Sequence, residues 1–414
     1  MKEFTNFEEM FAQSIGLEEP WRIERAEFEE DSRQVHIYVK ANKNAKYPCP
    51  ECGNLHKRYD DEEDERVWQH GDVVFFPCFV HCRRPRVKCD KGKSTHVVTA
   101  PWARKGSRYT LLFEAYCMLL AEKLPIEQAR KFVRISHTSF TNIVAYWVGK
   151  AVAEDDLSNV IDINIDETSF KKGQSYVTIV CDANARRVID VEDGRGAAQV
   201  EQFSLKLEIK GGDSNKIKHA VSDMSGAYLS GIADCFPNAK SIIDKFHVKK
   251  LMLDAMDKVR REEQGKERRQ RKAGRKLLMI PESRMNEQQH EKYLELSKKY
   301  PKTGRAFRMV QSLDVVYSGS NRKEGKEAFD KLISWLKRSR LVPMKDVAKT
   351  LLKYEEEILE YFTARLTNAI AEGINSIIQS GKRKARGFRT FKGYSTMIYL
   401  TCSKLKFAPI SLFE

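Results

Sequence analysis

Three acidic residues in short motifs are the side chains of this sequence best suited to chemistry. Asp166 follows the apolar run at 160–165 and is expected to end a buried strand, while Asp223 follows a second strand-like run at 218–221. Glu372 lies in a stretch with a helical pattern. Carboxylates from two strand ends and one helix make an all-oxygen set of the kind that hard divalent cations bind. Two such ions about 4 Å apart can activate water at a phosphodiester, so these residues form a candidate active site for cutting nucleic acid.

Three neighbouring residues complicate this assignment. Glu167 should point to the opposite face of its strand from Asp166, because successive side chains of a strand alternate between faces. Asp244 should end a neighbouring strand beside the site. His247 has two interpretations: it contacts the scissile phosphate near the metal site, or it is a structural histidine that caps a strand end.

A second group of candidate ligands lies in residues 1–105, which hold five of the nine cysteines. Cys49 and Cys52 form a Cys-x-x-Cys knuckle followed by glycine, a turn that aims two thiolates at one zinc ion. Cys89 begins a second half-site, but position 92 is Gly92, which has no ligand atom. We expect His96 to replace it as the fourth zinc ligand. The other candidates are Cys78, Cys82 and His81. The alternative is a degenerate finger whose thiols are buried without a metal.

The composition narrows the class of protein. A chain of 414 residues has room for two or three domains, and its 41% hydrophobic content supports a real core. Lys and Arg total 73 against 58 Asp and Glu, so the charge of +15 and the pI near 9.2 favour a polyanionic partner such as nucleic acid. No apolar run reaches the ~18 residues of a membrane span, and the first residues lack a signal-peptide core. We therefore expect a cytoplasmic protein with reduced cysteines.

Residues 106–155 have the pattern of a helix-turn-helix. A helical apolar pattern from Thr110 to Lys123 ends at Pro125, which opens a short helix, and a further helix is expected at 138–150. The second member of such a pair can enter a major groove. On that helix Ser139, Asn142 and Tyr146 could reach bases or phosphates. The alternative is an ordinary helical hairpin, and the net charge favours the DNA-binding interpretation.

The remainder of the chain predicts an α/β core with a helical insertion. Strands are expected at 160–165, 176–181, 187–192, 220–221 and 241–243, with a helix at 228–236. Three antiparallel strands followed by alternating helix and strand is the order of a ribonuclease H-like fold. Residues from about 248 to 365 are helical and strongly charged, and the basic run 266–272 suits a surface that faces phosphates. Lys382, Arg383 and Arg386 form a further cationic run close to the expected active site.

Taken together, these motifs make the chain resemble, over nearly its full length, a bacterial DDE transposase of the ISL3 insertion-sequence family. The residues that carry the resemblance lie at 49–53, 86–89, 101–103, 106–114, 165–170, 193–195, 222–224, 244–247, 366–375 and 386–388. The family implies a zinc-binding N-terminus, a helix-turn-helix that recognises transposon ends and a ribonuclease H-like core interrupted by a helical insertion. By position, its catalytic carboxylates fall on Asp166, Asp223 and Glu372. Gly92 departs from the family, whose members usually carry the last zinc ligand there.

The resemblance leads to a specific expectation for fold and function. We expect a zinc-finger-like β region at 1–105, a helix-turn-helix at 106–155, and a ribonuclease H-like transposase domain at 156–414 with an insertion at about 248–365. Two Mg²⁺ ions, or Mn²⁺ in their place, would support strand cleavage and strand transfer. The partners would be double-stranded DNA, as terminal inverted repeats and target, and further copies of the chain. The resemblance also implies a bacterial, nucleoid-associated location. The alternatives are a non-enzymatic DNA-binding regulator derived from a transposase, which needs no carboxylate triplet, and a ribonuclease H-like nuclease, which needs no end-recognition module.

Overall fold

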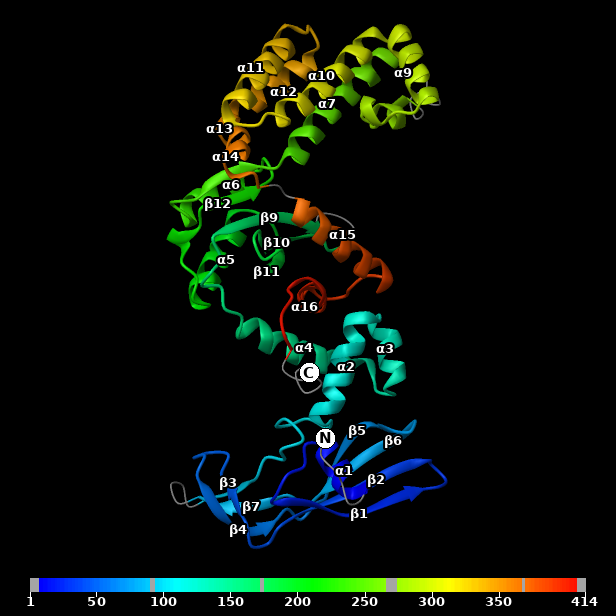
Figure 1. The fold of residues 1–414 in the computed structure, drawn as a ribbon, viewed down its shortest axis with the longest axis vertical. Helices are drawn as coiled ribbons and strands as arrows, with labels where there is room; N and C mark the ends of the chain where they lie inside the picture. Colours follow the sequence, from blue (N-terminus) through cyan, green and yellow to red (C-terminus); the bar gives the residue numbers. More distant parts are fainter. Residues whose placement is uncertain (1–6, 90–93, 172–174, 266–273, 367–368, 408–414) are drawn as a thin grey trace. The chain divides into compact units, whose positions relative to one another are not determined.

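The computed structural model describes residues 7–89, 94–171, 175–265, 274–366 and 369–407 (Figure 1). The chain forms two compact units, residues 1–152 with 405–414, and residues 153–404. Gly92 and the basic run 266–272 lie outside the described residues. Among the described residues, no helix is both long and apolar enough to cross a membrane.

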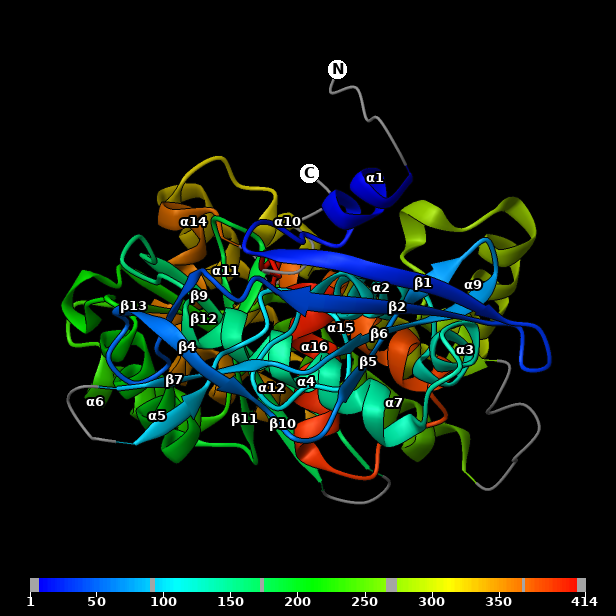
Figure 2. The same cartoon turned by 90° about the horizontal axis from the view of Figure 1, so that it is seen from below.

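Two four-stranded sheets follow the short helix α1 (Phe7–Ser14) in the first unit. The first has the order β1 (Trp21–Glu29), β2 (Gln34–Ala41), β6 (Phe76–Cys82) and β5 (Arg66–Val73). The second has the order β3 (Lys46–Pro48), β4 (Leu55–Asp61), β7 (Pro85–Lys88) and β8 (Thr95–Val97). Figure 2 shows β1 and β2 as a long hairpin. Trp102 packs edge-on against both Trp21 and Trp68, at centroid distances of 5.1 and 5.5 Å, in the core of this unit.

Three helices complete the first unit, as the sequence predicted. They are α2 (Leu111–Lys123), α3 (Ile126–Phe132) and α4 (His137–Ala153). Thr110 begins α2 by accepting a hydrogen bond from the amide of Phe113, which satisfies one of the free amides at a helix start. The fully buried carboxylate of Glu114 fixes the helices to one another, since it accepts hydrogen bonds from Arg104, Ser107 and the Trp147 indole.

A five-stranded mixed sheet is the centre of the second unit (Figure 1). Its order is β11 (Arg187–Asp193), β10 (Tyr176–Asp182), β9 (Asp162–Ser169), β12 (His219–Ser222) and β13 (Lys240–Ile243). Strands β9, β10 and β11 pair antiparallel, and β12 runs parallel to both β9 and β13. The expectation that a strand ends at Asp166 is wrong. Residues 166–169 continue β9 by pairing with β10, although their polar side chains hide the strand pattern.

Helices cover both faces of this sheet. On one face, α5 (Ala197–Ile209) and α6 (Gly226–Cys235) pack against Ile163 and Ile165. On the other, α15 (Ala369–Lys384) and α16 (Phe391–Cys402) pack against Val177 and Ile179. The short 3₁₀ helix η1 (Ser214–Lys216) leads into β12. Because side chains alternate along β9, Glu167 shares the face of Ile163 and Ile165, whereas Asp166 shares the face of α15.

A helical insertion separates β13 from α15, as predicted. Among the residues that the structure describes, its helices include α7 (Lys245–Gln264), η2 (Glu282–Arg284), α9 (Glu287–Lys299), α10 (Pro301–Tyr317), α11 (Arg322–Arg338), α12 (Val342–Lys353), α13 (Glu355–Leu359) and α14 (Tyr361–Ala364). They share a core of fully buried side chains that includes Met252, Phe307, Phe329 and Leu351. The polypeptide then returns to the sheet, where α15 lies beside β9 (Figure 1).

Candidate functional site

The strand register brings three aspartates to the same level of the central sheet. Val221 of β12 pairs with Asn164 of β9 and with Ile242 of β13. Two residues further along these three parallel strands stand Asp166, Asp223 and Asp244. Neighbouring strands lie about 4.8 Å apart, so the three positions form a row at the carboxyl ends of β12 and β13. The amide of Asp244 donates to the carbonyl of Ser222 at 3.1 Å, which continues the pairing of these strands.

Asp166 occupies the most restrained position in this row. Its Oδ1 accepts a hydrogen bond from the Glu167 amide at 2.8 Å, and its Oδ2 accepts one from the Asn375 side chain at 2.6 Å. Burial raises the pKa of Asp166 to about 7; the Glu167 amide opposes this rise, and the charges of Asp244, Asp223 and Glu167 add to it. A bound cation would favour the charged carboxylate and reverse the shift.

Asp223 lies directly after β12, as the sequence predicted. Its Oδ1 accepts a hydrogen bond from the amide of Ser225 at 2.9 Å, which orders the turn into α6. The side chain remains partly exposed. This carboxylate therefore has lone pairs available at the same level of the sheet as Asp166.

Glu372 lies on a helix, also as predicted, in the first turn of α15. One face of α15 is joined to β9 by three side-chain contacts: Asn375 to Asp166, Gln379 to Thr168 at 2.6 Å, and Lys382 to the Ser169 carbonyl at 2.6 Å. Glu372 precedes Asn375 by three residues and so lies one turn earlier on this face.

The charged groups that act on Glu372 are those around Asp244, at one end of the row of aspartates. Burial raises the pKa of Glu372, the Asp244 charge raises it further, and Lys245 and His247 oppose the rise. His247 lies in the first turn of α7 rather than at a strand end, and its amide donates to the Asp244 carbonyl at 3.0 Å. Among the described residues, only one group of three or more Cys, His, Asp or Glu side chains has all its ligand atoms within 4.8 Å of one another. This group consists of three cysteines. At least one oxygen separation among Asp166, Asp223 and Glu372 therefore exceeds 4.8 Å.

Asn375 is a residue of this site that the sequence analysis missed. Its Oδ1 is buried and accepts no hydrogen bond from any described residue, while its Nδ2 orients Asp166. The available signal was the spacing Glu372-x-x-Asn375, which places the two side chains on one helical face. The donor set of this region is carboxylate and amide oxygen, and it fits a hard divalent cation.

A second candidate metal centre lies in the first unit. The Sγ atoms of Cys49, Cys52 and Cys89 all lie within 4.8 Å of one another. The amide of Gly53 donates to the Cys49 carbonyl at 2.9 Å, and its φ of +72° requires glycine, so the knuckle forms the tight turn predicted for it. Three convergent thiols are soft donors that fit zinc.

None of the proposed fourth ligands has a ligand atom within 4.8 Å of all three sulfurs. His96 is opposite Val87 in the β7–β8 pair, and its Nε2 lies 2.8 Å from Oγ of Ser94. Cys78 and Cys82 lie on β6 in the other sheet, where burial raises the pKa of both thiols to about 12. His81 contacts Glu65 at 2.9 Å.

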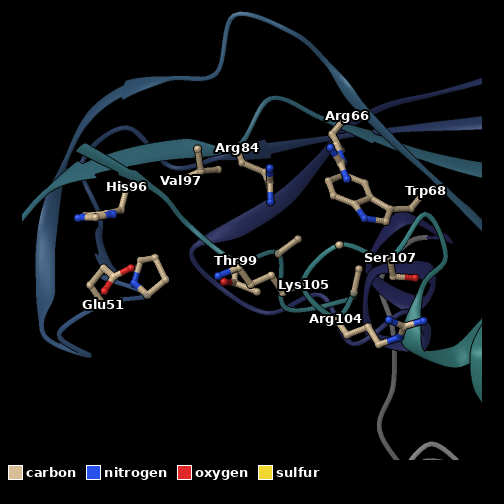
Figure 3. A pocket seen from close by; sticks show the side chains of 14 residues that line it. Glu51, Arg66, Trp68, Arg84, His96, Val97, Thr99, Arg104, Lys105 and Ser107 are labelled. Atoms are coloured by element: carbon tan, nitrogen blue, oxygen red, sulfur yellow. The ribbon is translucent and has the colours of Figure 1, made fainter. Parts of the chain in front are cut away.

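A cavity of about 290 Å³ lies close to these cysteines in the same unit (Figure 3). Its lining contains four cationic side chains: Arg66, Arg84, Arg104 and Lys105. Arg84 makes a bidentate contact with Glu62, and the Nε of Arg104 donates to both carboxylate oxygens of Glu114. Arg66 and Lys105 are exposed. Arg66 and Lys105 are therefore the cations of this lining that solvent and an anion can reach, and Glu51 adds one acidic side chain to it.

The helix α4 presents one polar face. Its apolar side, including Phe140 and Trp147, is buried, whereas Asn142 is exposed. Ser139 is partly engaged at the helix start, because its amide and hydroxyl both bond to the Ser136 hydroxyl at 3.0 Å. Tyr146 lies under the Arg104 guanidinium at 4.1 Å.

The three cations at the end of α15 differ in their availability. The ammonium of Lys382 bonds to Ser169, and burial lowers its pKa. Arg383 and Arg386 are exposed. Lys382 therefore supports the contact between α15 and β9, and the two arginines present charge to solvent.

Comparison with known proteins finds family matches to three segments of the chain. Residues 163–398 match the ISL3 transposase family, residues 98–148 match the helix-turn-helix domain of that family, and residues 46–92 match the zinc-finger of transposases IS204, IS1001, IS1096 and IS1165. The chain is 27% identical to the transposase for insertion sequence element IS1557 of Mycobacterium tuberculosis, over 95% of both chains. It is 24% identical to the transposase for IS1001 of Bordetella parapertussis, over 91% of this chain and 94% of the relative. The chain therefore belongs to the ISL3 family of insertion-sequence transposases.

Proposed function

We propose that residues 156–414 form a ribonuclease H-like core in which Asp166, Asp223 and Glu372 catalyse DNA strand cleavage and strand transfer at insertion-sequence ends. The observation that carries the proposal is the row of Asp166, Asp223 and Asp244 at one level of the central sheet, with Asn375 joining α15 to Asp166. The strand order β11-β10-β9-β12-β13, with the first three strands antiparallel, supports the ribonuclease H-like assignment.

The three carboxylates would hold two Mg²⁺ ions, or Mn²⁺. When bound, these ions would activate a water molecule and stabilise the leaving oxygen. Asp166 and Asp223 provide fixed oxygen donors from the sheet, and Glu372 provides the opposing donor from α15. Asn375 holds Asp166 in one orientation, and the neighbouring acid Asp244 raises the negative potential that attracts a cation.

The reaction would proceed in two steps at this site. Water attacks a phosphodiester at the insertion-sequence end, the P–O3′ bond breaks, and a 3′-hydroxyl is released. That hydroxyl then attacks a target phosphodiester, forming a new P–O bond as the target strand is cut. The held ends make the second step effectively intramolecular, which supplies much of its rate.

Recognition of the ends would belong to residues 1–155. The helix-turn-helix at 106–155 would place Asn142 and Ser139 of α4 in a major groove, and the zinc-finger-like region at 1–105 would add contacts. Arg66 and Lys105 at the cationic cavity, with Arg383 and Arg386 after the active site, would neutralise backbone phosphates. Because two ends must be joined, the working form would be an oligomer on double-stranded DNA in the bacterial cytoplasm.

A strand-cleavage assay with labelled end DNA and Mg²⁺ tests this proposal. Asp166→Asn, Asp223→Asn and Glu372→Gln should each abolish cleavage. Glu167→Gln is the matched control, because Glu167 is adjacent in sequence but shares the opposite face of β9. Cleavage by the three variants at the wild-type rate would refute the assignment.

A further inference from the structure

The three-cysteine group of the first unit is one ligand short of a structural zinc site. Such sites are almost always four-coordinate and tetrahedral. Cys49, Cys52 and Cys89 provide three thiolates, and Gly92 has no side chain that could provide a fourth ligand. The missing ligand must come from another residue near the knuckle or from solvent.

His56 makes a direct contact with one of these sulfurs. Its Nε2 lies 3.3 Å from Sγ of Cys52. Zn–S and Zn–N distances of about 2.3 and 2.0 Å with a tetrahedral angle put two such ligand atoms about 3.5 Å apart. The separation between His56 and Cys52 is thus the one expected of two ligands of the same zinc ion.

The backbone around His56 explains why its side chain is directed inward. His56 lies at the start of β4, four residues after Cys52, and pairs with Tyr47 of β3. Paired residues share one face of a ladder, and Tyr47 is only 1% exposed. His56 therefore lies on the inner face of the hairpin that carries the Cys-x-x-Cys knuckle.

His96 has no comparable contact. Its Nε2 is engaged with Ser94, and its side chain lines the cationic cavity (Figure 3). His56 itself is not within 4.8 Å of all three sulfurs. Its imidazole must turn toward Cys49 and Cys89 to close the tetrahedron, a motion about two side-chain torsions.

We propose that His56 is the fourth zinc ligand of this chain, so that the site is Cys₃His with both the second cysteine and the histidine contributed by one short segment, Cys52–His56. The proposal rests on zinc binding by the zinc-finger-like region and is independent of the proposed DNA cleavage chemistry. It places the ligand that replaces Gly92 before, rather than after, the second half-site.

Zinc affinity and cobalt spectroscopy on the full-length protein test this assignment. His56→Ala should weaken zinc binding, measured by competition with a chelator, by more than the about 10- to 100-fold that loss of an outer-shell partner costs. His96→Ala is the matched control and should leave the affinity unchanged. Both measurements are independent of transposition activity.

The variant His56→Cys distinguishes two roles of His56, that of a zinc ligand and that of a hydrogen-bond donor to Cys52. A ligand position should retain tight binding, and the thiolate-to-cobalt charge-transfer intensity should rise by about one third as the thiolates increase from three to four. Wild-type affinity in His56→Ala, loss of zinc in His96→Ala, or an unchanged cobalt spectrum in His56→Cys would overturn the assignment. Wild-type protein without bound zinc would overturn the site as a whole and leave the proposed active site untouched.

Discussion

Asn375 Nδ2 donates a 2.6 Å hydrogen bond to Asp166 Oδ2, across 209 residues of sequence and a complete helical insertion. This bond joins the helix of Glu372 to the strand of Asp166. It makes the position of one proposed catalytic carboxylate dependent on the helix that carries another.

Removing this bond should impair chemistry more than DNA binding. We expect Asn375→Ala to lower the cleavage rate by about 10- to 100-fold, the range for residues that orient metal ligands, with unchanged affinity for end DNA. Gln379→Ala removes a similar contact with β9 one turn away and serves as the control. Equal losses in the two variants, or lost DNA binding, would indicate that Asn375 only supports the fold.

The raised pKa of Asp166 should make the stability of the metal-free protein depend on pH. The folded state retains a proton on Asp166 up to about pH 7, whereas an unfolded aspartate loses it near 3.8. The native state therefore binds more protons in this window, and its stability falls as pH rises through it. Thermal unfolding in EDTA should show this loss of stability between about pH 4 and 7. The stability of Asp166→Asn should fall less over the same pH range, because the variant has no carboxyl group to titrate there.

Mg²⁺ should oppose that loss, since it binds the charged carboxylate. The rise in Tm on adding Mg²⁺ should be larger at pH 8 than at pH 5 in the wild type. A Mg²⁺ effect that is greatest at pH 5 would contradict Asp166 as a ligand.

Asp244 should influence the reaction through its charge. Its charge raises the pKa of both Asp166 and Glu372, so Asp244→Asn should lower these pKa values. The acidic limb of the pH–rate profile for cleavage should then shift to lower pH. Complete inactivity at every pH would instead indicate that Asp244 itself binds metal.

Recognition and chemistry should separate between the two ends of the chain. Asp223→Asn should still bind end DNA, because it loses no phosphate-contacting cation, whereas deletion of residues 1–153 should abolish specific binding. End binding that survives deletion of residues 1–153 would refute this division.

Single residues should affect DNA binding in different ways. Asn142→Ala should cost about 1–3 kcal/mol of binding free energy if Asn142 reads a base. Arg386→Gln should weaken binding to all sequences and reduce the salt slope by about 1.

The sequence predicted the elements that carry their own periodicity. Strands β10 and β11 and helices α2 to α4 have apolar residues at the spacing of their structure, and all were expected near their observed bounds. The extent of β9 was missed because Asp166 to Ser169 are polar, and only pairing with β10 reveals them as a strand. No helix was predicted at α5.

The candidate site was predicted only as far as local motifs reach. The motifs pointed to the three carboxylates that we propose as catalytic, but the contact of Asn375 with Asp166 depends on how α15 packs on β9. Likewise, the cysteine spacing predicted the knuckle, whereas the contact of His56 with Cys52 depends on the β3–β4 turn. Side-chain contacts of this kind arise from packing, which residue spacing does not encode.

Anomalous diffraction from crystals of the protein bound to end DNA and Mn²⁺ tests the central claim most directly. We predict two manganese peaks about 4 Å apart between the central sheet and α15, coordinated by Asp166, Asp223 and Glu372. Manganese bound elsewhere, or a Glu372 carboxylate more than about 10 Å from ions held by the two aspartates, would contradict it.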